Sequence, residues 1–219
     1  MLSEIINGFI TTKEADSYMP TDKFRMSYAG RCRLMRFWRR QGRPVTDKFD
    51  AKVKGTFEIG NIFHTWIQDT LKATGHLVGA EIKIEDEHRL GHADAIVKSE
   101  NGLILYDFKT VNSKKFFVLN KNGDKKGDVH YAFQLASYLL MLQNFYDNII
   151  DSKIAYICKD DFSILEVSIF DIEQNLLEKT QQDWDILINA WINQKEPEPN
   201  PLSWECNYCS YRTGCEQRK

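Results

Sequence analysis

The dipeptide Asn101-Gly102 separates two segments with the composition of β-strands, residues 92–99 and 103–110. Asn-Gly favours a two-residue type I′ turn, because both central residues of that turn require positive φ. The flanking residues are largely apolar and are bounded by turn formers, as in paired strands. We therefore predict a β-hairpin whose strands carry charged residues at the ends away from the turn.

The register of this hairpin decides which side chains meet. A two-residue turn pairs Ile96 with Asp107 and Asp94 with Lys109, and residues that are opposite or two apart share a sheet face. Asp94, Asp107 and Lys109 are therefore expected on one face and Phe108 on the other. A four-residue loop would keep this parity, whereas a three-residue loop would break it. Two carboxylates and one ammonium on one face can bind a divalent metal ion and a phosphate.

An alternative is a surface hairpin with an ordinary cross-strand Asp–Lys pair, which contributes little to stability. The run Leu103-Ile104-Leu105-Tyr106 argues against it, since continuous apolar runs are typical of strands buried on both faces. Charges at the end of a buried strand are costly unless they are paired or bind a metal. The hairpin is therefore a candidate metal and phosphate site.

The composition is that of an ordinary globular protein, with 219 residues, 42% of them hydrophobic and 27% charged, which is enough for one full core. No apolar run is long enough to span a membrane, and the start Met1-Leu2-Ser3-Glu4 lacks the basic region of a secretory signal. We expect a cytoplasmic protein in which residues 1–219 form a single domain and which has no membrane partner.

The net charge of −2 does not indicate nucleic-acid binding, so any such surface must be local. One arginine-rich segment also contains Phe37 and Trp38, and a group of lysines lies in and around the loop 120–128. Charge runs of this kind are more often solvated faces than phosphate-binding surfaces. The members are Arg31, Arg33, Arg36, Arg39, Arg40 and Arg43 in the first patch, and Lys114, Lys115, Lys121, Lys125 and Lys126 in the second.

Hydrophobic periodicity outside the hairpin alternates between helix and strand and predicts an α/β core. A helix over 53–74 carries His64 beside its apolar stripe, with Gly60 one turn earlier on the same face. A second helix over 131–145 carries Gln134 and Tyr138 one turn apart, a pair that in isolation would be ordinary surface residues. The stripe of the first helix consists of Ile59, Ile62, Phe63, Trp66, Ile67 and Leu71. The other predicted elements are helical pieces in the first fifty residues, including 28–40, strands at 77–85, 152–158 and 163–170, and a helix over 171–193 with Asp171 as its N-cap.

Three cysteines lie close together near the C-terminus, in Cys206-x-x-Cys209 and Cys215, after a proline-rich segment that rules out helix. This spacing in an intracellular protein indicates metal binding. The fourth thiolate must come from Cys32 or Cys158. Cys158 lies in an apolar strand, where a buried cysteine behaves as a small hydrophobe, so we favour Cys32. Four thiolates suit zinc or an iron–sulfur cluster, and their spacing alone leaves the metal open.

Taken in order along the chain, these motifs resemble those of the RecB-like branch of the PD-(D/E)xK nucleases. The resemblance extends from Cys32 to Cys215 and is greatest to the iron–sulfur members, the CRISPR-associated adaptation exonucleases and the nuclease domain of AddB. Asp107 stands where many members have glutamate. The motifs that carry the resemblance are Gly60-x-x-x-His64, Gly91-x-x-Asp94, Asp107-x-Lys109, Gln134-x-x-x-Tyr138 and the one-plus-three layout of the cysteines.

The resemblance implies a restriction-endonuclease-like core, a central mixed sheet flanked by helices, with residues 28–50 and 196–219 forming a cysteine-cluster subregion. A [4Fe–4S] cluster, with zinc the less favoured metal, would be bound by Cys32, Cys206, Cys209 and Cys215. Magnesium or manganese would be bound by His64, Asp94, Asp107 and the Phe108 carbonyl, and the imidazole favours manganese.

The same resemblance implies roles for the remaining site residues. Lys109 would orient a water molecule and stabilise developing charge, and Gln134 and Tyr138 would position Lys109 or the DNA backbone. Two further residues stay open as participants. His92 shares the face of Asp94 by parity, and Glu81 lies on the preceding strand.

We therefore expect a divalent-metal-dependent deoxyribonuclease that degrades DNA from single-stranded ends, in DNA repair, recombination or CRISPR spacer acquisition. A helicase or CRISPR adaptation proteins would act in trans. One alternative is a catalytically silent DNA-binding scaffold, although every expected catalytic residue is present. Another is a sequence-specific restriction endonuclease, although such enzymes usually lack the Gln-x-x-x-Tyr motif and the cysteines.

The expected preference for single strands rests on an enclosed passage, across which the cluster would fasten the arginine-rich segment. Arg36, Arg39 and Arg40 would bind phosphates there, and Phe37 or Trp38 would stack on bases. The alternative is that Phe37 and Trp38 are core residues, which for one of them is at least as well supported.

Overall fold

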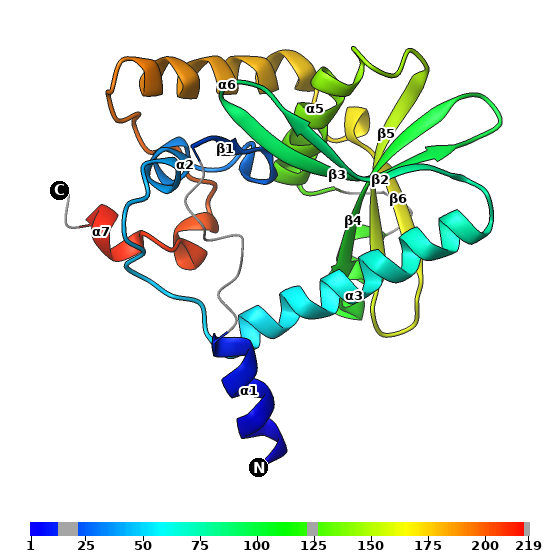
Figure 1. Cartoon of the computed structure of the whole chain (residues 1–219), viewed down its shortest axis with the longest axis horizontal. Coiled ribbons are helices and arrows are strands. Elements are labelled where there is room, and N and C mark those ends of the chain that lie inside the picture. Colours follow the sequence, from blue (N-terminus) through cyan, green and yellow to red (C-terminus); the bar gives the residue numbers. More distant parts are fainter. Residues whose placement is uncertain (13–21, 122–126, 217–219) are drawn as a thin grey trace.

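A six-stranded mixed sheet lies at the centre of the protein (Figure 1). The computed structural model describes residues 1–12, 22–121 and 127–216. The strand order is β1-β3-β4-β5-β6, and β2 pairs with β3. The pairs β4–β5 and β1–β3 are parallel and the others are antiparallel, which confirms the predicted mixed sheet. The strands are β1 (Phe24–Arg25), β2 (Leu77–Glu85), β3 (Arg89–Lys98), β4 (Leu103–Val111), β5 (Ile149–Cys158) and β6 (Ile164–Ser168).

Helices cover both faces of the sheet (Figure 1). On one face, Phe63, Ile67 and Leu71 of α3 pack against Phe108 and a small apolar cluster. The larger core lies on the other face, beneath α5 and α6. None of the helices in the described part of the chain is long and apolar enough to cross a membrane. The helices are α1 (Leu2–Thr12), α2 (Arg33–Arg40), α3 (Ala51–Ala73), α4 (Ser113–Leu119), α5 (Val129–Leu142), α6 (Leu176–Ile192) and α7 (Arg212–Glu216).

The predicted hairpin is present, but its turn differs from the prediction. Lys98 pairs with Leu103, so the loop comprises four residues, 99–102, and Asn101 does not have the positive φ that a type I′ turn requires. Glycine is needed at position 102 because Ile150 packs closely against it: a Cβ there would lie 2.7 Å from Ile150 Cγ2. Because four is even, the loop preserves the predicted parity. The pair Ala95–Tyr106 is followed by Asp94 and Asp107.

Helix α3 buries only part of its predicted apolar stripe. Its residues Ile59, Ile62 and Trp66 are 41, 68 and 54% exposed, because they lie on a neighbouring row of the helix that does not face the sheet. No residue of α3 is fully buried. Periodicity therefore identified the helix but overestimated how much of it the core covers.

Helix α6 begins at Leu176, five residues later than predicted by the Asp171 cap. Asp171 instead ends a short 3₁₀ helix, and Asn175, with φ 54°, precedes α6. Three short elements, β1, α4 and α7, were not predicted, because none of them is long enough to show a period. Lys125 and Lys126 of the predicted loop lie outside the described residues.

The segment that contains α2 lies beside the C-terminal tail, with α2 near α7 (Figure 1). The backbone N–H groups of Thr46 and Asp47 both donate to the Ser210 carbonyl, each at 3.0 Å. The Trp38 indole N–H donates to Glu196 at 2.8 Å. These contacts attach the C-terminal tail to α2 and to the segment that follows it.

Candidate active site

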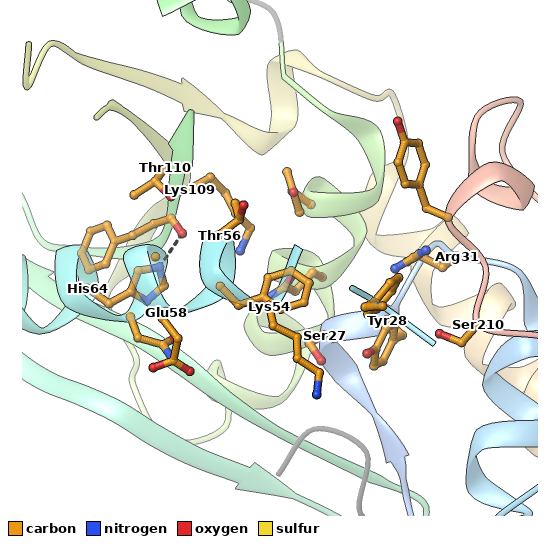
Figure 2. Close-up of a pocket in the computed structure, with 18 of the residues that line it drawn as sticks. Ser27, Tyr28, Arg31, Lys54, Thr56, Glu58, His64, Lys109, Thr110 and Ser210 are labelled. Carbon is orange, nitrogen blue, oxygen red and sulfur yellow. Dashed lines mark hydrogen bonds between the residues drawn. The ribbon is translucent and has the colours of Figure 1, made fainter. Parts of the chain in front are cut away.

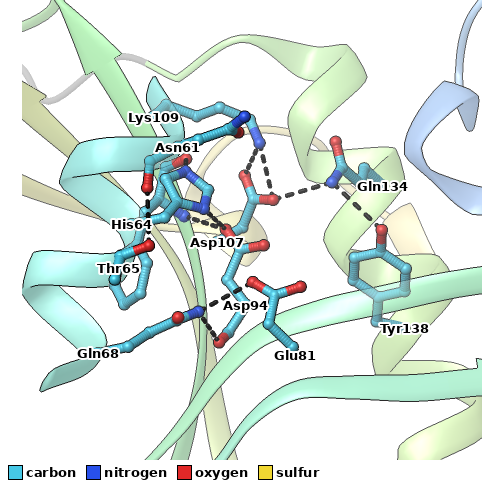
Figure 3. A network of polar contacts seen from close by, with 11 residues as sticks. Asn61, His64, Thr65, Gln68, Glu81, Asp94, Asp107, Lys109, Gln134 and Tyr138 are labelled. Carbon is cyan, nitrogen blue, oxygen red and sulfur yellow. Dashed lines mark hydrogen bonds and ion pairs between the residues drawn. The ribbon is translucent and has the colours of Figure 1, made fainter. Parts of the chain in front are cut away.

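The strands β3 and β4 separate beyond the pair Ala95–Tyr106, and polar side chains occupy the fork between them. Asp94 Oδ2 accepts a hydrogen bond from the Phe108 N–H at 2.7 Å, in place of a bond of the strand ladder. His64 reaches the fork from α3, with its Nε2 2.8 Å from the Phe108 carbonyl. Because a carbonyl only accepts, Nε2 carries the proton. The Nδ1 lone pair is then left facing Asp94 Oδ2 at 3.6 Å (Figure 3).

His64, Glu81 and Asp94 form the one group of three or more potential metal ligands whose atoms all lie within 4.8 Å in the described residues. Divalent ions bind oxygen at about 2.0–2.6 Å, so this spread is close to the diameter of one coordination sphere. One imidazole and two carboxylates suit Mn²⁺ or Mg²⁺. The donor set therefore fits a hard divalent ion.

Glu81 was left open from the sequence, and the structure brings it beside Asp94. Its neighbours Ala80 and Ile82 pair with Ala95 and Ala93, which places Glu81 across the ladder from Asp94. Its φ is 46°, which is uncommon for a non-glycine residue and is typical of constrained sites. The detectable signal was an acid in the middle of an otherwise largely apolar strand.

Gln68 of α3 holds the two acidic strands together at this point. Its Nε2 donates to Glu81 Oε1 at 3.0 Å and to the Asp94 carbonyl at 2.9 Å. Figure 3 shows this bridge below His64. Gln68 was not among the predicted site residues, because a single glutamine on a helix has no distinctive spacing.

Asp107 lies deeper and is bound by other partners. It is 0% exposed, and its two carboxylate oxygens lie 2.8 and 2.6 Å from Lys109 Nζ. Gln134 Nε2 donates to Asp107 at 2.9 Å and to the Tyr138 hydroxyl at 3.3 Å. The predicted set of His64, Asp94, Asp107 and Phe108 is thus divided. His64 and Asp94 gather with Glu81, Asp107 pairs with Lys109, and the Phe108 carbonyl accepts from His64.

Gly91 has a physical role in the Gly91-x-x-Asp94 motif. A Cβ at this position would lie 2.5 Å from Tyr138 Cε1 and 2.9 Å from Met26 Cβ. Only glycine lets the Tyr138 ring approach β3 this closely. Gly60 differs, since the nearest atom to its Cβ would be Thr110 Oγ1 at 3.8 Å. That is an ordinary contact distance, so packing does not require glycine at this position.

The electrostatics of the fork favour a bound cation. Burial, reinforced by Asp107, raises the pKa of Asp94 to about 8. Burial also opposes the charge of Lys109, but Asp107 and Asp94 outweigh it and raise the pKa of Lys109 to about 12. Burial and the charge of Lys109 lower the pKa of His64, so its imidazole is neutral near pH 7 and able to ligate. Without an ion, the site holds a proton on Asp94 that a cation would replace.

His92 does not join the group of ligands. It is exposed and pairs with Lys83 in the sheet. It lies two residues before Asp94, which is about 6–7 Å along an extended strand. Shared parity therefore did not bring it to the fork.

A cleft of about 710 Å³ runs from the fork towards the C-terminal tail (Figure 2). Figure 2 shows His64 and Lys109 near one end and Arg31 and Ser210 near the other. Its charged lining residues are Arg31, Arg39, Lys54, Lys109 and Glu58, and its aromatic ones are Tyr28, Phe49, Phe57, Phe108, Tyr131 and Tyr208.

The arginine-rich segment is largely structural, contrary to part of the prediction. Arg36 is 2% exposed and forms an ion pair with Asp183. Phe37 and Trp38 are 2 and 1% exposed, so they are core residues and cannot stack on bases. Arg40, which was also expected to bind phosphate, stacks on Phe24 and Trp191. Arg31 and Arg39 are the two arginines of this segment that line the cleft.

The cysteines of the two chain ends approach each other without forming a closed group. The Cys32 N–H donates to both carboxylate oxygens of Glu205, each at 3.1 Å, and Glu205 directly precedes Cys206. Cys209 and Cys215 pack against the same core as Cys32. No three cysteines in the described residues bring their sulfurs within 4.8 Å of one another. The predicted four-thiolate site is therefore not preformed.

Cys158 lies apart from these residues. It is 1% exposed at the end of β5, with its Sγ 3.7 Å from the Ser113 hydroxyl. Its surroundings are those of a small buried hydrophobe.

A family model described as the PD-(D/E)XK nuclease superfamily matches residues 76–216. The matched segment includes Glu81, Asp94, Asp107 and Lys109, whereas His64 and Cys32 precede it. No curated protein sequence matches the chain.

Among solved structures, the crystal structure of SSO0001 is similar to the whole chain. The identity is 19% and the TM-score 0.61, over 100% of this chain and 98% of that one. A putative exonuclease from Eubacterium rectale is similar at 13% identity and a TM-score of 0.47, over 87 and 88% of the two chains. An alkaline exonuclease from Laribacter hongkongensis has 16% identity and a TM-score of 0.43, over 59 and 67%. The likeness to SSO0001 shows that the fold is shared along the full length.

Proposed function

The chain belongs to the PD-(D/E)XK nuclease superfamily, and on that premise we propose that it is a divalent-metal-dependent exonuclease acting on single-stranded DNA ends. One observation carries the proposal. His64, Glu81 and Asp94 converge at the fork, with the Asp107–Lys109 pair directly beside them. This arrangement places a candidate metal site and the ammonium group of Lys109 next to each other at one end of a basic cleft.

The ion would be Mn²⁺ or Mg²⁺, held by His64, Glu81 and Asp94, with Asp107 as the adjacent carboxylate. Such an ion supplies a Lewis acid that polarises the scissile phosphate and activates water. The neutral His64 imidazole favours Mn²⁺. The hydrogen bond from His64 Nε2 to the Phe108 carbonyl keeps the proton off Nδ1 and leaves that nitrogen free to ligate.

Lys109 would stabilise the negative charge that develops on the phosphate, which is the kind of electrostatic effect that dominates many catalysed reactions. Its raised pKa keeps it protonated throughout the physiological range. Gln134 and Tyr138 act indirectly, through Asp107. Tyr138 holds Gln134, Gln134 holds Asp107, and Asp107 fixes the position of the Lys109 ammonium.

Exonuclease action on single strands is supported by the position and lining of the cleft. It lies between α3 and the tail, with Lys54 and Glu58 on one wall and Tyr208 and Ser210 on the other. A strand bound between two walls enters most readily from an end. The cations of the lining attract phosphates, so binding should weaken with salt.

We also propose that the chain belongs to the RecB-like iron–sulfur branch, with a [4Fe–4S] cluster on Cys32, Cys206, Cys209 and Cys215. The Glu205 carboxylate supports this ligand set, because it connects the Cys32 backbone to the residue before Cys206. Zinc–sulfur distances of about 2.3 Å would keep the sulfurs of a zinc site within about 4.6 Å. A four-iron cluster is larger than one ion, so its thiolates stand farther apart than those of a zinc site. DNA repair, recombination and CRISPR spacer acquisition are the contexts that such a protein would serve, with a helicase or CRISPR adaptation proteins acting in trans.

The function is tested with anaerobically purified protein and Mn²⁺ on three substrates. These are end-labelled single strands, end-labelled duplexes and closed single-stranded circles. We expect release of nucleotides from single-stranded ends and no cleavage of circles. Lys109→Ala, purified in the same way, controls for contaminating nucleases. Binding without cleavage would indicate the silent scaffold, and cutting of duplexes at defined sequences would indicate a restriction-type enzyme.

The metal of the cysteine subregion is tested on the same preparation. Iron, zinc and sulfide contents and the visible absorption spectrum distinguish a cluster from zinc. Stoichiometric iron and sulfide are expected. Zinc alone, or no metal in anaerobic protein, would contradict the iron–sulfur assignment while leaving the nuclease proposal intact.

A further inference from the structure

Two large aromatic side chains of the cleft are exposed, although the aromatic residues of α2 are buried. Tyr208, on the tail, is 62% exposed, and Phe57, on α3, is 49% exposed. Both line the cleft that begins at the fork. Their exposure has no explanation in the packing of the core, since neither belongs to the core or to the residues packed against it.

The two rings come from opposite walls. Phe57 lies on α3, seven residues before His64, with its ring 6.0 Å from that of Phe49. Tyr208 lies in the short 3₁₀ helix Glu205–Tyr208, with its ring 6.3 Å from that of Trp204. A ligand that occupied the cleft could therefore touch an aromatic face on each side.

Cations lie between the aromatic residues. The guanidinium groups of Arg31 and Arg39 lie 5.5 and 4.5 Å from the centre of the Tyr28 ring, and both line the cleft. Arg31 is also paired with the buried carboxylate of Glu205 at 3.1 Å, which limits its freedom to move. Lys109, at the fork, lies 4.6 Å above the Tyr131 ring. The lining of the cleft therefore combines cationic groups with aromatic rings.

A lining that combines rings and cations matches the chemistry of a nucleic-acid strand with unpaired bases. Phosphates bind the cations, and bases stack on the rings, an interaction that is tolerant of sequence because every base has a π-face. In a duplex the base faces are covered by neighbouring pairs, so the rings have nothing to stack on. The cleft therefore discriminates by strand state rather than by base identity.

We propose that Phe57 and Tyr208 are base-stacking residues that hold one unpaired strand across the cleft, between the fork and the cysteine-bearing tail. This inference rests on the proposed function, because it names the residues that select the substrate of the same site. Both act on substrate binding, and neither lies at the reacting phosphate.

The test measures binding separately from cleavage. In Ca²⁺, which coordinates oxygen more loosely than Mg²⁺, fluorescence anisotropy follows a labelled oligothymidylate, a duplex of the same length and an abasic strand. Tyr208→Ala and Phe57→Ala should each weaken oligothymidylate binding by about 5- to 100-fold, the usual range for losing one stacked base. Binding of the duplex and of the abasic strand should change by less than about twofold, and Tyr208→Trp should retain affinity.

Two further comparisons keep the test decisive. Phe145 lies outside the cleft and is 77% exposed, so Phe145→Ala should not change oligothymidylate binding. Because Tyr208 lies between two cysteines, its variant is checked for metal content, and Phe57→Ala tests the same idea from the wall without cysteines. With Mn²⁺, both variants should raise KM for single strands and leave kcat nearly unchanged.

Unchanged oligothymidylate affinity in both alanine variants would overturn the inference, as would an equal loss on abasic strands. The latter result would mean that the rings contact the backbone or support the fold. Failure of the proposed function has a different signature, since wild-type protein would then cleave no DNA in Mn²⁺. The anisotropy comparison in Ca²⁺ would still be informative in that case.

Discussion

The fork between β3 and β4 and the cysteine-bearing ends of the chain hold their polar groups in different ways. At the fork, hydrogen bonds and ion pairs within the protein fix the side chains of the proposed ion site. Asp94 is fixed by the Phe108 N–H, Glu81 by Gln68, and Asp107 by Lys109 and Gln134. Among the described cysteines of the two chain ends, by contrast, no three sulfurs converge.

The difference follows from the backbone that carries each site. Strands β2, β3 and β4 are held by ladder hydrogen bonds up to the fork, so their register brings Glu81, Asp94 and Asp107 close together. The tail consists of turns and short helices, and its one buried polar anchor to Cys32 is Glu205. A site built on strands is preformed, whereas a site built on such segments depends on its metal to complete it.

Replacing Lys109 would test the preformed site with the largest expected effect. Lys109→Ala should reduce the cleavage rate by about 100- to 1000-fold, because it removes a charge aimed at the transition state. Lys153→Ala is the matched control, since Lys153 is also a sheet lysine paired with a carboxylate, Glu166 at 3.2 Å. Near-normal cleavage by purified Lys109→Ala would remove the proposed mechanism.

Lys109→Ala should also lower the stability of the fold. The buried Asp107 carboxylate would lose its cation and keep only Gln134, and leaving a buried charge uncompensated is destabilising. Thermal melting in chelator should therefore show a lower Tm for Lys109→Ala than for Lys153→Ala. Equal Tm values would mean that Asp107 is neutralised in another way.

Metal affinity decides between Glu81 and Asp107 as ligands. Glu81→Gln and Asp94→Asn should each weaken Mn²⁺ binding by at least about tenfold, since even partners of ligands contribute 10- to 100-fold. Asp107→Asn should weaken it less, because Asp107 is already paired with Lys109. Isothermal titration calorimetry measures all three. A larger loss in Asp107→Asn than in Glu81→Gln would restore Asp107 to the ligand set.

The pH dependence of metal binding should report the proton on Asp94. Its pKa is raised to about 8, so below that pH an ion must displace a proton, and Mn²⁺ affinity should fall by about tenfold per unit. When a chelator removes the metal, the stability of the fold should change with pH in the opposite direction to metal affinity. The folded protein binds this proton and the unfolded chain does not between about pH 4 and pH 8, so stability should decline as pH rises through that window.

Asp94→Asn is the control for both slopes. It should flatten the decline in Tm, and each kcal/mol recovered at pH 8 should raise Tm by roughly 2–4 °C in a protein of this size. The asparagine oxygen still accepts from the Phe108 N–H. A pH-independent Mn²⁺ affinity between pH 6 and pH 8 in the wild type would show that Asp94 carries no such proton.

The cysteine subregion should give the smallest effect on cleavage, because it lies away from the fork. Cys32→Ser should lose the bound metal and lower Tm, while retaining more activity than any substitution at the fork. Cys158→Ser should keep the metal and lose only modest packing. Iron analysis and thermal melting measure both. Retained iron in Cys32→Ser together with loss in Cys158→Ser would reverse the ligand assignment.

What the sequence determined about this protein is local in origin. The alternation of strands and helices predicted the α/β core, and parity within one hairpin predicted Asp94, Asp107 and Lys109 on one face even though the turn was misjudged. Parity depends only on the two-residue period of a strand, so an even change in loop length leaves it intact. One helical turn likewise sufficed to bring Gln134 next to Tyr138.

Only the tertiary structure decided which partners meet across long separations. Glu81 joins the metal group through pairing of β2 with β3, and Arg36 is withdrawn from any nucleic-acid surface by Asp183, 147 residues away. Phe37 and Trp38 became core residues because α2 packs between α6 and the tail. The period of a segment shows which of its faces is apolar. What covers that face, and which charges it meets, depends on how the whole chain packs.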